Sequence, residues 1–341
     1  MPPKVSVVIP TYNNAALLHE TLGGVRRQTF KDFEIIVVDD GSTDDTAEAV
    51  KRFDPGIRYL RQSNQGPAAA RNKGAAVAQG EFIAFCDHDD IWNERHLDAL
   101  LGCFADYAST AMVFDDAQYF GEGVAAEEPH VGAKVVPSMV GKQVPIKRLW
   151  QCWVASMSVV MVRKSVFEEL GGLHAGILGL DDLHFYLRLA ARFEVRYVEY
   201  VGCRKRLTEK NLLPQVGLKG LVHCLEDLQQ HHPEVVQAIG PARFRTRLAR
   251  KYRKLAAGYL KEEKQGLARA LYWKAYKENV FDLRYLWKYL LAQRRSQERG
   301  RRSANSTRFS PDEPQCFGCR LPTGIKEQSW DIGERERSAE A

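Results

Sequence analysis

The chain has 341 residues, of which 45% are hydrophobic and 27% charged, and its formal net charge is +6 at pH 7. This balance is typical of a globular protein. No apolar run approaches the roughly 20 residues that a membrane-spanning helix needs. The seven cysteines lack a regular spacing, so we expect reduced thiols and a cytoplasmic location. We also expect no signal peptide, because the first residues lead directly into a strand-like run.

Strand-like and helix-like segments alternate through the first hundred residues. Buried strands are predicted over four apolar runs: Val5–Ile9, Phe33–Val38, Ile57–Leu60 and Glu81–Phe85. Helical patterns separate or follow them: Leu17–Val25, Asp45–Phe53, Pro67–Ala78 and Glu94–Tyr107. Such alternation indicates βαβ units with right-handed crossovers. We therefore predict an α/β fold with a mostly parallel, Rossmann-like central sheet and flanking helices.

The pattern is less regular after residue 107. Further strands are predicted over three runs: Ala111–Phe114, Val159–Val162 and Val195–Val201. Helices are predicted over Lys164–Leu170 and from Leu180 onward, where Asp181 and Asp182 open the helix. From about Pro241 to Leu291, apolar and aromatic residues recur at helical spacing, which indicates a small appendage of two or three helices.

Three of the predicted strands end in polar turns, at Pro10–Asn13, Asp39–Ser42 and Asp87–Asp90. The carboxyl ends of parallel strands share one edge of a sheet, so these turns are expected to line one site. The last turn carries three carboxylates in four positions, and carboxylate oxygens suit Mg²⁺ or Mn²⁺ bound with a diphosphate. The alternative is a solvated acidic turn that caps the next helix.

Positive charge is concentrated near the C-terminus. Between Arg243 and Arg302, 19 basic residues stand against 5 acidic ones. Such helices, which also carry tryptophan and tyrosine, suit contact with an anionic membrane, although a solvated helical face is the simpler alternative. These helices contain no motif that recognises nucleotide bases, which argues against a nucleic-acid partner. We divide the chain into residues 1–215, a basic helical region over 216–293 and a tail over 294–341 that we predict to be disordered.

Four separated motifs together resemble family 2 glycosyltransferases. They are Val5-Ser-Val-Val-Ile-Pro-Thr-Tyr-Asn13, Glu34-Ile-Ile-Val-Val-Asp-Asp-Gly-Ser-Thr-Asp44, Asn64-Gln-Gly-Pro-Ala-Ala-Ala-Arg-Asn72 and Ala84-Phe-Cys-Asp-His-Asp-Asp-Ile-Trp92. A weaker continuation runs from Gly171 to Leu189 and includes Asp181-Asp182. The resemblance covers about residues 4–210 and not the basic helices. It implies a GT-A fold and an inverting enzyme that uses a nucleotide sugar and a divalent metal.

The resemblance also implies roles for individual residues. The expected sugar-donor residues are Pro10, Thr11 and Tyr12 around the nucleobase, Asp40 as acceptor of the uracil N–H, Arg71 on the diphosphate and Asp87 near the ribose or metal. Asp89 is the first candidate metal ligand, and Asp87 is the second. Asp40 favours a UDP-sugar over other nucleotide sugars, because a carboxylate only accepts hydrogen bonds.

The acceptor half matches the family less closely. Asp182 aligns with the aspartate of the family's Glu-Asp pair and is the candidate catalytic base, while Asp181 replaces the glutamate. The family's Arg-x-His is replaced by Arg204-Lys205-Arg206, in which Arg206 is no metal ligand but suits a phosphate.

The expected function is transfer of a sugar to a hydroxyl group of a glycan or lipid-linked acceptor in surface glycan, capsule or lipopolysaccharide synthesis. This would take place in the cytoplasm, at the inner membrane face. The alternative is a nucleotide-sugar-binding protein of the same fold without transfer activity. A nucleotidyltransferase is disfavoured, because Pro10–Asn14 contains neither the glycine nor the lysine of a phosphate-binding loop.

Overall fold

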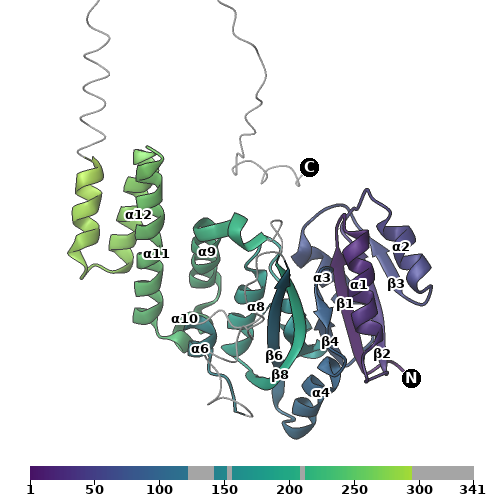
Figure 1. Ribbon diagram of the computed structural model, residues 1–341. Coiled ribbons are helices and arrows are strands. Elements are labelled where there is room, and N and C mark those ends of the chain that lie inside the picture. Colours follow the sequence, from purple (N-terminus) through teal and green to yellow (C-terminus); the bar gives the residue numbers. More distant parts are fainter. Residues whose placement is uncertain (122–141, 152–155, 208–211, 294–341) are drawn as a thin grey trace, which may run out of the picture. The chain divides into compact units, whose positions relative to one another are not determined.

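The computed structural model describes residues 1–121, 142–151, 156–207 and 212–293, and it contains one mixed eight-stranded sheet (Figure 1). The strands are β1 (Val5–Thr11), β2 (Phe33–Asp39), β3 (Arg58–Arg61), β4 (Phe82–Phe85), β5 (Ile91–Trp92), β6 (Thr110–Gly121), β7 (Val160–Arg163) and β8 (Glu194–Leu207). Their order in the sheet is β3-β2-β1-β4-β7-β6-β8-β5.

The first four strands are parallel and follow the sequence prediction closely. Every residue of β1 is buried, as expected for a β-branched run with helices on both sides. The register places Thr11 opposite Asp39 and Val8 opposite Phe85. The loops after β1, β2 and β4 therefore leave the sheet at the same edge.

The second part of the sheet was harder to predict. Strand β7 runs antiparallel to both β4 and β6, whereas β6 and β8 are parallel partners along most of their length. Both β6 and β8 extend beyond their predicted ends, because their polar second halves pair with each other. The pairing of Ile91 in β5 with Arg204 in β8 brings the basic end of β8 beside the turn after β4.

Helices cover the sheet, and all but the one over Ile146–Gln151 form where the sequence predicted them. They are α1 (Ala15–Arg26), α2 (Thr46–Phe53), α3 (Pro67–Val77), α4 (His96–Asp106), α6 (Ile146–Gln151), α7 (Lys164–Glu169) and α8 (Asp181–Ala190). Gly24 lets α1 approach β5 closely, since a Cβ atom there would lie 3.1 Å from the backbone nitrogen of Trp92.

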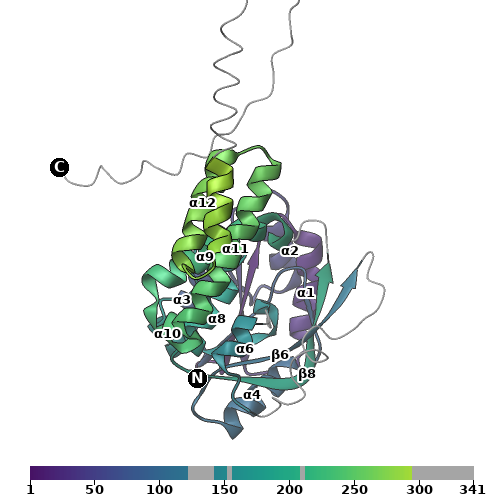
Figure 2. The ribbon, with the colours of Figure 1, turned by 90° about the vertical axis from the view of Figure 1, so that its left-hand side faces the viewer.

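The basic region is helical, as predicted. Its helices are α9 (Leu212–His231), α10 (Pro233–Ile239), α11 (Pro241–Lys261), α12 (Gln265–Glu278) and a last helix over residues 283–293. Helices α11 and α12 lie side by side in both views (Figure 1, Figure 2). Phe244 of α11 stacks on Trp150 of α6 with ring centroids 4.9 Å apart. The helical region thus shares a hydrophobic core with the sheet domain.

Residues 1–293 form one compact unit, and the predicted tail over 294–341 lies outside the described residues. The division at residue 215 therefore stays a prediction. No helix in the described part of the chain combines the length and apolarity needed to cross a membrane. The cysteines in the same part, Cys86, Cys103, Cys203 and Cys224, are buried free thiols.

Candidate active site

The loops that follow β1 and β2 are hydrogen-bonded to each other. The backbone N–H of Asp40 donates to the carbonyl of Thr11 at 2.8 Å, and the N–H of Asn13 donates to Oγ of Ser42 at 2.9 Å. Oδ1 of Asn13 accepts from the N–H of Thr43 at 2.7 Å. These bonds make one rigid unit of two turns that are about 30 residues apart in the chain.

The three residues predicted around the nucleobase differ in exposure. Pro10 and Thr11 are buried, whereas Tyr12 is 44% exposed. Tyr12 thus offers an open ring face for stacking, and the other two shape the backbone beneath it. The carbonyl of Pro10 lies 3.2 Å from Nδ1 of His88, which joins these loops to the acidic turn after β4.

The acidic turn is held in place through its backbone. Oγ1 of Thr21 in α1 donates to the carbonyls of His88 and Asp90, at 2.9 and 2.8 Å. The N–H of Asp87 donates to Oγ of Ser158 at 2.9 Å. Anchored in this way, the turn keeps its side chains close to the first two loops, so the structure brings the three predicted turns together.

Asp40 organises the loop before α3. Its Oδ1 accepts from Nε2 of Gln62 at 2.8 Å and from the N–H of Gln65 at 2.9 Å, and its Oδ2 accepts from the N–H of Gly66 at 2.8 Å. The two oxygens of a carboxylate have about four lone-pair sites. Three of these sites already accept hydrogen bonds within the protein. The buried Asp40 carboxylate can therefore accept one more hydrogen bond, such as one from a nucleobase N–H.

Arg71 joins two carboxylates that the sequence did not link. Its Nη2 donates to Oδ1 of Asp87 at 2.5 Å, and its Nη1 donates to Oδ2 of Asp181 at 3.0 Å. Arg71 itself is only 7% exposed. Burial alone would raise the pKa of Asp87, but the charges of Arg71 and Lys205 outweigh it and hold that pKa well below its usual range. Arg71 thus holds the acidic turn against the start of α8.

Asp182 lies in the first turn of α8, next to Asp181. Its Oδ1 accepts from the N–H of Leu183 at 2.6 Å. Burial, and then the neighbouring charge of Asp181, raise the pKa of Asp182 to about 7. A carboxyl group that titrates near neutrality has the basicity that suits a general base.

Asp89 differs from its acidic neighbours. Asp87 has Arg71 and Asp90 has Lys205, whose Nζ lies 3.1 Å from Oδ2 of Asp90. In the part of the chain that the structure describes, the Asp89 carboxylate has neither a hydrogen-bond nor an ion-pair partner, and only its carbonyl accepts, from Nε of Arg206 at 3.2 Å. An uncompensated, half-buried carboxylate is the group in this turn best able to hold a cation.

Comparison with known proteins agrees with this geometry. A family-wide profile described as Glycosyl transferase family 2 matches residues 6–171. Over this segment the chain resembles glycosyl transferase family 2. Its curated relatives include the GalNAc(5)-diNAcBac-PP-undecaprenol beta-1,3-glucosyltransferase of Campylobacter jejuni, which is 44% identical over 93 residues, or 26% of this chain and 30% of the relative. The chain spans only 17–33% of the lengths of the first curated relatives it matches.

Solved structures share the GT-A fold of this chain. The Staphylococcus aureus TarS fragment 1–349 in complex with UDP superposes with a TM-score of 0.63 at 16% identity, over 88% of this chain and 92% of that fragment. The mannosyltransferase PcManGT of Pyrobaculum calidifontis, in complex with GDP-Man and Mn²⁺, gives a TM-score of 0.53 at 21% identity, over 86% of each chain. These likenesses show the fold alone.

Sequence reasoning missed two residues of the candidate site. Lys205 on β8 reaches both Asp87, at 3.6 Å, and Asp90, at 3.1 Å. Ser158, just before β7, holds the Asp87 backbone. A basic triplet at the end of a predicted strand was the available signal for Lys205, but only the sheet topology shows which carboxylates it faces. The sequence carried no signal for Ser158.

Proposed function

We propose that this protein is an inverting glycosyltransferase that moves a sugar from a nucleotide sugar to a hydroxyl acceptor. The observation that carries the proposal is the convergence of three loop tips around an uncompensated carboxylate, Asp89, with the candidate base Asp182 linked to the same site through Asp181 and Arg71. In this proposal, charge stabilisation and proton removal belong to one connected network.

A UDP-sugar is the proposed donor. Tyr12 supplies a stacking face, and Asp40 has acceptor capacity for the N–H of a uracil base. TarS was solved with UDP, which supports uridine, whereas PcManGT was solved with GDP-Man. The preference for UDP therefore rests on Asp40.

The residues present fit a bound Mg²⁺ or Mn²⁺. Asp89 would be the principal ligand and Asp87 the second, with diphosphate oxygens of the nucleotide completing the coordination, as is usual for Mg²⁺ sites. Such an ion neutralises the negative charge that develops on the departing nucleoside diphosphate. Lys205 and Arg71 fix the orientation of Asp87.

Asp182 is the proposed general base. It would accept the proton of the attacking hydroxyl group, whose oxygen displaces the nucleoside diphosphate from the opposite face of the sugar in one step. A single displacement inverts the configuration at the anomeric carbon. Arg71, paired with Asp87 and Asp181 rather than pointing into solvent, is proposed as a positioning residue for the two halves of the site.

A glycan or lipid-linked glycan is the proposed acceptor, and surface polysaccharide synthesis in the cytoplasm is the proposed setting. The undecaprenol-linked substrate in the name of the Campylobacter relative supports a lipid-linked acceptor. We also propose that residues 1–215 carry the catalytic domain and that the basic helices over 216–293 touch an anionic membrane.

The test is turnover of UDP-sugars by the purified full chain with Mn²⁺. Asp182→Asn keeps the shape of the side chain but removes the base, so we expect turnover to fall by about 10²–10⁴-fold while UDP affinity is unchanged. The exposed Asp106→Asn on α4 is the matched control and should retain full activity. Tight UDP binding without turnover by the parent protein would instead favour the non-catalytic alternative.

A further inference from the structure

A cluster of histidines lies where α8 meets α9 and α10. We define the histidine cluster as His174, His184, Asp227, His231 and His232. His184 is on α8, Asp227 and His231 are on α9, and His232 is the residue before α10. His174 and His184 fall within the weaker motif from Gly171 to Leu189, but the proposed reaction uses none of the five residues.

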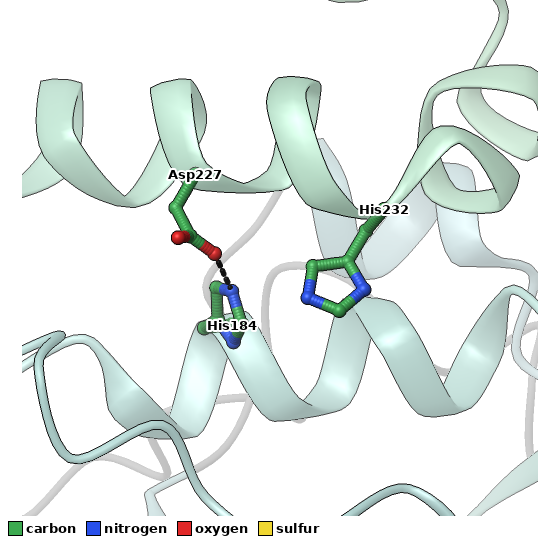
Figure 3. Close-up of side chains that lie close together, drawn as sticks. All are labelled: His184, Asp227 and His232. Carbon is green, nitrogen blue, oxygen red and sulfur yellow. Dashed lines mark hydrogen bonds and ion pairs between the residues drawn. The ribbon is translucent and has the colours of Figure 1, made fainter. Parts of the chain in front are cut away.

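We propose that His184, Asp227 and His232 form a binding site for a Zn²⁺-class transition-metal ion. One candidate ligand atom of each residue lies within 4.8 Å of those of the other two. Nε2 of His184 is 2.8 Å from Oδ2 of Asp227, and the rings of His184 and His232 are 5.2 Å apart (Figure 3). Two imidazole nitrogens and one carboxylate oxygen are a ligand set that proteins use for zinc.

The orientation of His232 supports this assignment. Its Nδ1 faces Oε1 of Glu234 at 3.2 Å, which leaves Nε2 as the ligand atom, and Figure 3 shows a ring nitrogen of His232 turned toward His184. A carboxylate on the second ring nitrogen is the usual outer partner of a metal-binding histidine. Zn–N bonds of about 2.0–2.1 Å require the three side chains to close in slightly, which rotation of the partly exposed His232 allows.

The surroundings suit a neutral ligand set and an entry path. Burial, and then the charge of Arg188, lower the pKa of His184 to about 3, so its ring is neutral as a metal ligand must be. Arg188 adds positive charge, which Asp227 and Glu234 offset. His174 and His231, whose side chains are 43% and 55% exposed, border Asp227 on the solvent side. Either one can supply a further ligand.

The site would tie three helices together. His184 follows Asp181 and Asp182 on α8 by one turn or less, whereas Asp227 and His232 belong to the helical region. A bound ion would therefore fix the helix that carries the proposed base against α9 and α10. The consequence for turnover rests on the proposed function, but the metal site itself does not.

The experiment measures Zn²⁺ binding to the untagged, chelator-treated full chain by calorimetry, with metal content determined by elemental analysis. We expect one Zn²⁺ per chain from this site, and at least a tenfold loss of affinity in His232→Ala and in the near-isosteric Asp227→Asn. His223→Ala, an exposed histidine one turn earlier on α9, is the matched control and should bind as the parent does. Asp89→Asn should also leave this Zn²⁺ bound, which separates it from the ion of the sugar-donor site.

Thermal unfolding provides a second readout, because a ligand that binds only the native state raises the melting temperature. Zn²⁺ should raise it for the parent and for His223→Ala, but not for Asp227→Asn. Absence of a bound Zn²⁺ in the parent, equal affinity in His232→Ala and Asp227→Asn, or equal loss in His223→Ala would each overturn the metal site. A parent protein that binds Zn²⁺ at this site but does not turn over UDP-sugars would count against the proposed function alone.

Discussion

Arg71 determines which carboxylates of the site carry uncompensated negative charge. It pairs with Asp87 and Asp181, so its one positive charge stabilises both carboxylates within the protein. The carboxylates of Asp89 and Asp182 have no ion-pair partner among the described residues. These are the two groups proposed to bind the metal and to accept the proton. One buried guanidinium thus separates two ion-paired carboxylates from two that have no such partner among the described residues.

A second buried pair, outside the site, gives a pH-dependent stability. Nδ1 of His96 lies 2.7 Å from Oδ2 of Asp115, and both side chains are fully buried. Burial raises the pKa of Asp115 from 3.8 to about 6, although His96 opposes the shift. The native protein therefore holds this proton more tightly than the unfolded chain, so the stabilisation is present below about pH 4 and is lost as the pH rises through about 6.

Asp115→Asn should remove this dependence. The unfolding free energy of the variant minus that of the parent should increase by up to about 3 kcal/mol from pH 4 to pH 7. His96 and Asp116 also influence the carboxyl group of Asp115. The quantity to compare is therefore the difference in unfolding free energy between variant and parent, measured by urea unfolding at each pH. Asp106→Asn on the exposed face of α4 is the control. A constant difference for Asp115→Asn across this range would contradict the prediction.

At the scale of elements, the close approach of α3 to the sheet sets the position of Arg71. A Cβ atom at Gly74 of α3 would lie 2.4 Å from Cγ1 of Val8 and 3.1 Å from Cγ2 of Val38. Gly74→Ala should therefore push α3 away from the sheet and cost about 1–3 kcal/mol of unfolding free energy, as overpacking generally does. Denaturant unfolding measures the loss.

Gly102 of α4 is the matched comparison, because no atom lies within 4 Å of its added Cβ. Gly102→Ala should stabilise the protein by up to about 1 kcal/mol, the helix-propensity difference between the two residues. Similar losses in both variants would show that the contact under Gly74 does not limit the approach of α3. Weaker UDP binding in Gly74→Ala but not in Gly102→Ala would show that the displacement of α3 also disturbs the proposed site through Arg71.

The sequence predicted elements well wherever side-chain pattern alone determines them. The runs of β1 and β2 are apolar because both faces are buried, so their strands and the polar turns after them could be placed. Strand β8 ends in Arg204-Lys205-Arg206, which resembles a loop until its pairing with β5 and β6 is known. Contacts between distant segments, such as Arg71 with Asp181, depend on the path of the chain and leave no local pattern.

At the scale of the whole molecule, positive charge and exposed apolar side chains occur together in the last helices. Between residues 243 and 293, 14 basic residues stand against 4 acidic ones. Phe281 is 94% exposed, Leu283 65% and Trp287 60%. Aromatic side chains that enter the interface and basic residues that meet anionic headgroups are the two components of peripheral membrane binding.

We therefore expect the full chain to sediment with vesicles that contain phosphatidylserine but weakly with pure phosphatidylcholine, because each basic residue near an anionic surface adds about 1 kcal/mol. Raising the salt concentration to 1 M should release it, since the Debye length falls to about 3 Å. The double variant Phe281→Ser, Trp287→Ser removes the inserted rings and should lower the bound fraction at least tenfold. Leu178→Ser, at a site of 52% exposure before α8, is the control for loss of an exposed apolar residue. Equal binding of the parent to both vesicle types would mean that the basic helices present only a solvated face. Binding of the double variant as strong as that of the parent would mean the same.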